Sequence, residues 1–371
     1  MNKIRIMYAM GGVMNRAGAE SMTMQYMRHL RKDERFEFSF VVHGNVKGDF
    51  DDEILSYGIP IYHVPVRGKH PFSYSTNVKK ILKEHPVDII HCDMDTSCGY
   101  FLKIAKDCGI PVRIAHSHST DYLNKNFIRK AVAIQSKNEI RTVATERFAC
   151  SYKAGKWLFP NDEFTVVNNA IDLKPYIPNR ITREKKRIEL GIPEDTFVLG
   201  HIGRFSPPKN HVGLLKIYAE LKKKRKNTKL ILVGTGELLD VIRELARNLE
   251  IEKDVLFLGV RSDIPELFQA IDTFVMPSNW EGLPVAGIEA QAAGLPCIFS
   301  DAVTSEVCMT DFAKRLPKNN IDLWVDMLKN MQKKRNAVES HKSLREHGYD
   351  IETEAEKMAN LYVKAYLNSE K

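Results

Sequence analysis

Short apolar runs alternate with longer amphipathic segments along most of this 371-residue chain. Runs that are apolar at consecutive positions, rather than at every second one, are typical of parallel strands covered by helices on both faces. We therefore predict an α/β fold. The predicted strands are Ile4–Met10, Phe36–His43, Ile61–Pro65, Val87–His91, Val112–His116, Phe148–Ser151, Phe164–Val167, Phe197–Gly203, Leu230–Gly234, Val255–Leu258, Thr273–Met276 and Cys297–Ser300.

The alternation is interrupted once and then starts again. Residues Asp172–Arg187 carry prolines and a basic run, which is typical of a linker that leads into a helix. The pattern predicts two doubly wound domains, residues 1–175 and 176–350, followed by a final helix in 351–371. That helix, Ile351–Leu367, has one apolar face that needs a partner.

Composition excludes several classes of protein. Hydrophobic residues make up 43% of the chain and charged residues 27%, as in globular proteins and unlike disordered ones. Met1–Met10 lacks the features of a signal peptide, and no window of about 18 apolar residues predicts a membrane span. The six cysteines form no CxxC pair, which favours reduced thiols in the cytoplasm over a zinc site, although His91 and Cys92 are adjacent.

The net charge of +8 is concentrated in the first half of the chain. Residues 1–180 hold 26 Lys and Arg against 19 Asp and Glu, whereas residues 181–371 hold 29 against 28. Such an excess suits nucleic acid, an anionic lipid surface or a phosphorylated ligand. Basic runs such as Lys222–Lys226 lack the interleaved aromatic residues that stack on bases, so we expect no nucleic-acid partner.

Ligands of open α/β sheets bind beyond the carboxyl ends of the strands, and two facing sheets would form a cleft between them. The segment NWEGLPVAGIEAQAAG, residues 279–294, follows one predicted strand. Gly282 allows a tight turn and Pro284 suits the first turn of a helix, whose free N–H groups attract anions. Glu281 and Glu289 could meet two ends of a phosphorylated ligand. Alternatively, Glu281 is solvated and Glu289 caps its own helix.

Cations and glycines follow other strands of the second half. Arg204 and Lys209, in GRFSPPKNH, suit a diphosphate, although each could be an ordinary surface cation. Gly234 opens a GTGEL turn, and Arg261 in GVRSD could lie against a base.

The first half offers weaker signals. Gly11 and Gly12 begin the segment GGVMNRAGAE, which has the glycine content of a phosphate-approach loop. Its spacing is not GxGxxG, which argues against a nicotinamide enzyme. His116 and His118, in RIAHSH, could be hydrogen-bonding or acid–base groups, or packed side chains.

Together these motifs resemble glycosyltransferase family 4, the retaining group 1 transferases of the two-domain GT-B fold. The matching segments run in family order along nearly the whole chain, and the bacterial exopolysaccharide and capsule enzymes resemble it most. The segments are GAE at 18–20, RIAHSH, NNAID at 168–172, GRFSPPKNH, LVGTGEL, FLGVRSDIPEL and the segment from Pro277 to Asp301 that holds the E-x7-E pair.

The resemblance implies a role for each residue. Arg204 and Lys209 would bind the donor diphosphate, Glu281 the donor sugar and Glu289 the ribose, while His116 would lie near the transferred sugar. The remaining expected contacts are Gly282, Leu283, Pro284, Val285, Gly234, Gly11 and Gly12 to the donor, Arg261 to the base, and Glu20 and His118 on the acceptor side.

The resemblance also implies a UDP-sugar donor, a glycan or lipid-linked acceptor and a cytoplasmic enzyme, with possible docking on an anionic membrane. No metal is expected, because no Asp-x-Asp site is part of the family pattern, and the triplet Asp93-Met94-Asp95 is a chance match in the wrong place. The final helix would pack back on the first domain. The alternatives are an isomerase or epimerase of the same fold and a binding protein without turnover.

Overall fold

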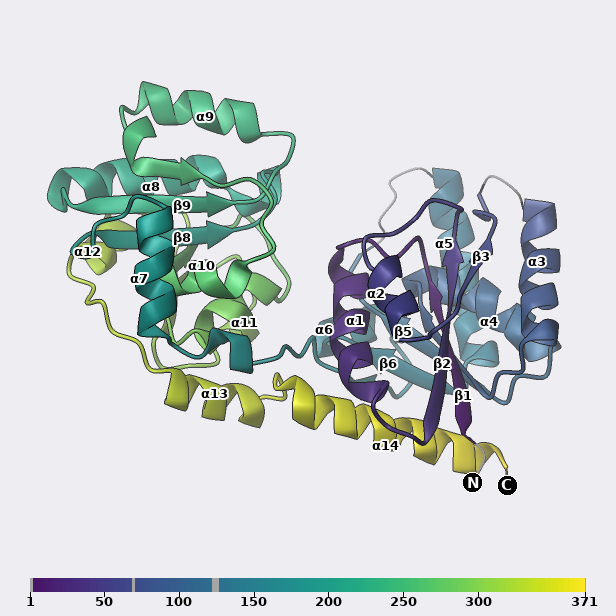
Figure 1. Ribbon diagram of the computed structural model, residues 1–371. Coiled ribbons are helices and arrows are strands. Elements are labelled where there is room, and N and C mark those ends of the chain that lie inside the picture. The colour runs from purple at the N-terminus through teal and green to yellow at the C-terminus, as the bar shows by residue number, and fades with distance from the viewer. Residues whose placement is uncertain (1–2, 69–70, 122–126, 371) are drawn as a thin grey trace. The chain divides into compact units, whose positions relative to one another are not determined.

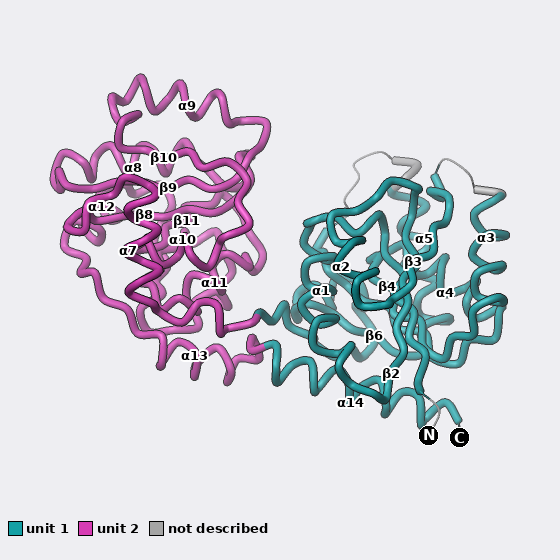
Figure 2. Tube along the Cα trace, viewed as in Figure 1, with its two compact units in different colours: residues 1–171, 351–371 teal, residues 172–350 magenta. Residues whose placement is uncertain are grey.

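The computed structural model describes residues 3–68, 71–121 and 127–370. The chain forms two compact units, residues 1–171 with 351–371 and residues 172–350 (Figure 2). Within the described residues, no helix is both long enough and apolar enough to span a membrane.

Unit 1 is built on a seven-stranded parallel sheet with the order β3-β2-β1-β4-β5-β6-β7 (Figure 1). Side chains of β1 alternate between its faces, so Ile6 and Tyr8 join one apolar core while Met7 and Ala9 join the other. The strands are β1 (Ile4–Met10), β2 (Phe36–His43), β3 (Ile61–Val64), β4 (Ile89–Asp93), β5 (Val112–Ser117), β6 (Glu146–Ala149) and β7 (Thr165–Val166).

Helices cover both faces of this sheet. Buried residues of α1, α2 and α14 contribute to one core, and those of α3, α4, α5 and α6 contribute to the other. The helices are α1 (Gly18–Leu30), α2 (Asp51–Ser56), α3 (Pro71–Glu84), α4 (Cys98–Asp107), α5 (Phe127–Val143), α6 (Tyr152–Leu158) and α14 (Ile351–Ser369).

The C-terminal helix α14 belongs to unit 1, although almost 180 residues of unit 2 precede it. It lies beside α1 and buries Ile351, Met358 and Tyr362 in the same core as the first strand (Figure 1). The predicted return of this helix to the first domain is confirmed, and its apolar face packs against α1 and the core on that side of the sheet.

Unit 2 repeats the architecture with a six-stranded parallel sheet in the order β10-β9-β8-β11-β12-β13. Its strands are β8 (Phe197–Ile202), β9 (Thr228–Val233), β10 (Val255–Phe257), β11 (Thr273–Met276), β12 (Cys297–Ser300) and β13 (Ala313–Leu316). Its helices are α7 (Arg180–Glu189), α8 (His211–Lys224), α9 (Leu239–Asn248), α10 (Ile264–Ala270), α11 (Val285–Ala292), α12 (Ile321–Lys329) and α13 (Ala337–Glu346).

Most predicted strands have bounds that shift by one or two residues, and β13 and β4 show most clearly why prediction and structure differ. The edge strand β13 was not predicted, because its central Lys314 and Arg315 are exposed and break the apolar run. Strand β4 begins two residues later than expected and continues to Asp93, which pairs with Met10 of β1. The polar end of β4 therefore lies inside the sheet, where the pattern of apolar residues gave no sign of it.

Candidate functional site

Polar side chains of unit 2 gather where β8 and β11 end, at the point where the strand order of the sheet reverses. Lys209 ends a short 3-10 turn after β8, and Glu281 lies in the loop after β11. The Lys209 Nζ and Glu281 Oε2 atoms are 2.7 Å apart, with only 17% and 16% of the two side chains exposed. The structure thus joins two residues that were predicted separately.

Two asparagines hold these loops together. The Asn279 backbone N–H donates to Pro208 O at 2.7 Å, and the Asn210 side-chain amide donates to Pro277 O at 2.9 Å. Asn210 also caps α8 from a left-handed conformation with φ of +52°. Neither asparagine was predicted, although both lie within the motifs GRFSPPKNH and NWEGLPV, because an asparagine in a loop has no pattern that reveals its partner.

Glu289 lies beyond the first turn of α11 and does not cap its own helix. Its Oε1 atom accepts a hydrogen bond from the Tyr176 hydroxyl at 2.7 Å. Burial raises the pKa of the carboxyl to about 7, against the Tyr176 hydrogen bond, which lowers it. Tyr176 was not predicted as part of the site, because it lies 113 residues away in the linker.

The start of α11 corrects one detail of the prediction. Pro284 is the N-cap residue and Val285 the first helical one, so the proline lies just before the first turn. Gly282 does not adopt a positive φ, so its backbone conformation does not require a glycine. Among the described residues, a Cβ at Gly282 would meet nothing within 4 Å.

Gly234 is a glycine for a structural reason. Its φ is +134°, and a Cβ there would lie 2.2 Å from the Gly203 carbonyl oxygen. The backbone N–H of Gly203 donates to Val233 O, and that of Gly234 donates to Gly259 O. The GTGEL turn therefore packs tightly against the loop after β8, which carries Arg204.

The two predicted arginines differ in how firmly they are held. The Arg204 side chain is 72% exposed and pairs at 3.1 Å with the exposed Glu237, an interaction of little energetic weight. Arg261 donates to both carboxylate oxygens of Asp263 and to Glu189, and hydrogen bonds with Asp263 raise its pKa. The guanidinium predicted to contact a base is therefore engaged by carboxylates of its own unit.

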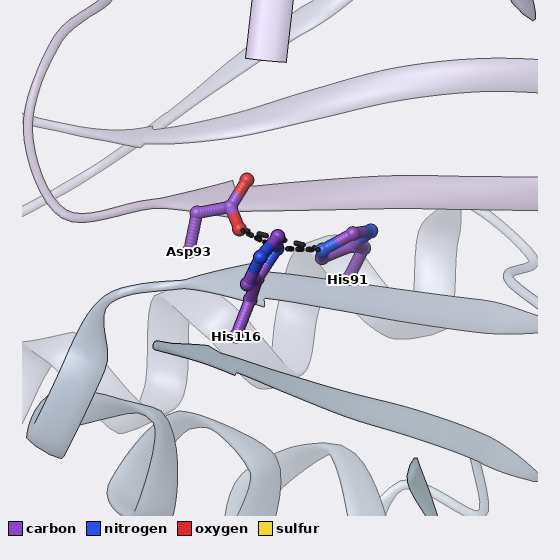
Figure 3. A group of neighbouring side chains, drawn as sticks. All are labelled: His91, Asp93 and His116. Atoms are coloured by element: carbon purple, nitrogen blue, oxygen red, sulfur yellow. Dashed lines mark hydrogen bonds and ion pairs between the residues drawn. The ribbon is translucent and has the colours of Figure 1, made fainter. Parts of the chain in front are cut away.

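In unit 1, His116 ends up in the interior rather than at the surface. Its side chain is 1% exposed, and burial lowers its pKa to about 3. Its Nδ1 lies 2.9 Å from His91 Nε2 and 3.1 Å from Asp93 Oδ1 (Figure 3). The position of His116 gives no support to the expected contact with a transferred sugar.

His118 is the more accessible histidine, with 10% of its side chain exposed. Its Nε2 lies 3.0 Å from Asp93 Oδ1, and its backbone N–H donates to Asp95 Oδ1 at 2.7 Å. Burial is the largest single influence and opposes a charge on this ring, but the hydrogen bonds and charges of Asp93 and Cys150 together raise the pKa well above its usual value. Asp93 and Asp95 thus position the loop after β5.

Within the described ranges, one group of three side chains could hold a metal ion, namely His91, Asp93 and His116. Neither His91 nor Asp93 was predicted to be a metal ligand. The two strands that bring these residues together, β4 and β5, are neighbours in the sheet, and that pairing is not visible in the spacing.

The remaining predicted positions of unit 1 are Gly11, Gly12 and Glu20. A Cβ at Gly11 would lie 3.6 Å from Met94 Cγ, and one at Gly12 would meet nothing within 4 Å. Glu20 lies partly exposed in the first turn of α1.

The chain matches known families along most of its length. Residues 182–350 match the model for glycosyl transferases group 1, and residues 16–175 match that for Glycosyltransferase Family 4. A protein of Bacillus subtilis (strain 168) named as a glycosyltransferase, EpsF, is 34% identical over 96% of each chain.

Other relatives have more specific names. The UDP-Gal:alpha-D-GlcNAc-diphosphoundecaprenol alpha-1,3-galactosyltransferase of Escherichia coli is 26% identical over 95% of each chain. The capsular polysaccharide biosynthesis glycosyltransferase CapH of Staphylococcus aureus is 27% identical over 75% of this chain and 76% of CapH. The crystal structure of Anabaena Alr3699/HepE in complex with UDP has a TM-score of 0.79 at 18% identity, covering 97% of this chain and 100% of that one. This likeness confirms the predicted class of fold.

Proposed function

The chain is a glycosyltransferase of the group 1 and family 4 type, and from this we propose that it transfers a sugar from a UDP-sugar to a glycan or lipid-linked acceptor. The names of the Escherichia coli and Staphylococcus aureus relatives support this proposal, as does the UDP bound to Alr3699/HepE. We place the reaction in bacterial surface polysaccharide synthesis, on the cytoplasmic side of the membrane.

The observation that carries the proposal is the Lys209–Glu281 pair beside the start of α11. Both charges are mostly buried and already positioned by the loops after β8 and β11. As the bond between sugar and diphosphate breaks, negative charge grows on the diphosphate, and a fixed cation stabilises that charge more in the transition state than in the ground state. We assign this role to Lys209 and, once it leaves Glu237, to Arg204.

The two carboxylates bind hydroxyl groups of the donor. In this proposal Glu281 accepts hydrogen bonds from the sugar while it orients Lys209. Glu289 accepts hydrogen bonds from the ribose while Tyr176 holds its carboxylate. Gly282 lets the donor approach the backbone at residues 282–285, where no side chain caps α11. The transfer would proceed with retention by front-face attack, and a trapped glycosyl-enzyme adduct would contradict that route.

We further propose that the diphosphate needs no divalent cation, because Lys209 and Arg204 supply the positive charge. Turnover should then be unchanged when Mg²⁺ or Mn²⁺ is added, or when EDTA is present during the assay. Loss of turnover in EDTA that Mg²⁺ restores at once would overturn this part of the proposal.

The test combines a donor screen with one pair of variants. UDP-sugars, but not GDP- or ADP-sugars, should be turned over with a lipid-linked acceptor, and isomerised donor without acceptor would favour the epimerase alternative. Lys209→Ala should lower kcat by about 100-fold or more, since it removes a preorganised charge. Lys216→Ala, at an exposed position on α8, is the matched control and should leave kcat unchanged. Equal rates in the two variants would contradict the site.

A further inference from the structure

Three potential ligand atoms of unit 1 form a compact triangle in the protein interior. His91 Nε2 and His116 Nδ1 are 2.9 Å apart, His116 Nδ1 and Asp93 Oδ1 are 3.1 Å apart, and His91 Nε2 and Asp93 Oδ1 are 3.4 Å apart. Each of the three side chains is 1% exposed. All three groups point toward one another (Figure 3).

The edges of this triangle match those of a metal site. Imidazole nitrogens and carboxylate oxygens bind zinc at about 2.0–2.2 Å. With bonds of that length, ligand atoms at right angles lie about 3.0 Å apart, and those at tetrahedral angles about 3.4 Å apart. The three measured edges fall close to this interval, so one ion could reach all three atoms with shifts of a few tenths of an ångström.

A fourth group meets the same carboxylate, because His118 Nε2 lies 3.0 Å from Asp93 Oδ1. Without a metal, the N–H groups of His116 and His118 can both donate to Asp93, and the lone pair of His91 Nε2 lies beside these donors. With or without a metal, His116 Nε2 is buried without a partner among the described residues. A cation at the centre of the triangle would accept the lone pairs of His91, His116 and Asp93 at once.

The outer atoms of two of these residues are already held, as they are around metal ligands. His91 Nδ1 lies 2.5 Å from the Tyr362 hydroxyl, which in turn lies 2.6 Å from the Tyr8 hydroxyl. Asp93 Oδ2 accepts a hydrogen bond from Thr23 Oγ1 at 3.0 Å. These contacts come from α14, β1 and α1, so three elements of unit 1 orient the cluster.

We propose that His91, Asp93 and His116 bind one divalent transition-metal ion, which we expect to be zinc, in the interior of unit 1. Two imidazoles and one carboxylate are a ligand set that zinc accepts. The ion has a structural role, because it would link β4 and β5 and, through Tyr362, α14. It is separate from the diphosphate site, all of whose residues belong to unit 2, and it does not depend on the proposed function.

The first experiment measures metal bound to the full-length protein after purification without added metal. We expect about one zinc ion per chain in the wild type and less than about 0.1 in the His91→Gln/His116→Gln double variant. His43→Gln is the matched control, because His43 is a buried histidine of the same unit that lies outside the cluster. It should keep its metal. Equal metal content in the double variant and the wild type would overturn the proposal.

The second experiment does not depend on a variant that folds. Wild-type protein is unfolded with a chelator, refolded without metal, and titrated with Zn²⁺ or with Co²⁺ as a spectroscopic substitute. We expect Tm to rise by about 5–10 °C with saturating Zn²⁺ and cobalt d–d absorption to saturate at about one equivalent. An unchanged Tm and no d–d absorption with either ion would show that the cluster is a metal-free hydrogen-bonded network.

Discussion

Among single residues, Glu289 has the environment that most affects the pH dependence of donor binding at the proposed site. Its carboxyl is buried enough to have a pKa of about 7, and the hydrogen bond that Tyr176 donates favours the charged form. A ribose-binding carboxylate accepts hydrogen bonds best when it is ionised. The protonation of Glu289 should therefore govern donor affinity near neutral pH.

We predict that affinity for a UDP-sugar rises as pH increases through about 7, because Glu289 becomes ionised over that range. The Tyr176→Phe variant should shift this midpoint to higher pH, since the hydrogen bond that lowers the pKa is lost. Titration calorimetry at several pH values measures both effects. Glu289→Gln is the control and should bind weakly at every pH; a wild-type profile in Glu289→Gln would contradict the assignment.

At the level of elements, the loops after the strands contain two glycines that are under different structural constraints. Gly234 has a positive φ and no room for a Cβ beside the Gly203 carbonyl, so packing of the loops requires it. Gly282 has neither constraint, and its open side faces away from other protein atoms. Substitution by alanine should therefore have different effects at Gly234 and at Gly282.

Gly234→Ala should lower the free energy of unfolding by about 2–4 kcal/mol, because the new methyl group meets the backbone in an unfavourable conformation. Gly282→Ala should change stability by less than about 0.5 kcal/mol. If the donor approaches the backbone at 282, the second variant should instead weaken UDP-sugar binding. Denaturant unfolding and calorimetry on both variants measure these effects, and unchanged donor affinity in Gly282→Ala would exclude that approach.

For the whole molecule, the notable property is the net positive charge. Unit 1, which includes α14, carries 27 basic and 22 acidic side chains, unit 2 carries 28 and 25, and the proposed diphosphate site lies in unit 2. Binding of the donor therefore does not account for the basic excess of unit 1. An anionic membrane that presents a lipid-linked acceptor would account for it, whereas a scattered excess of solvated charges would have no such effect.

If the basic half docks on membranes, the protein should sediment with anionic vesicles and not with neutral phosphatidylcholine vesicles. Each cation near such a surface contributes up to about 1 kcal/mol. Raising the salt concentration should release the protein, because the interaction is screened. Binding that is independent of lipid charge or of salt would contradict electrostatic docking.

The class of fold and the residues that we propose for the donor site can be predicted from the sequence alone. Continuous apolar runs predicted β1, β2, β11 and β12 with their observed bounds, because the burial of a parallel strand on both faces is recorded locally. The E-x7-E spacing and the nearby cations are likewise local patterns.

How distant residues meet depends on the tertiary structure. Tyr176 and Glu289 are 113 residues apart, Lys209 and Glu281 are 72 apart, and Tyr362 reaches His91 across 271 residues. The burial of His116 and its contact with Asp93 follow from the pairing of β4 with β5, not from the residues beside it. The order of strands in the sheet and the return of α14 to unit 1 bring these residues together. Such contacts therefore leave no periodic pattern in the sequence.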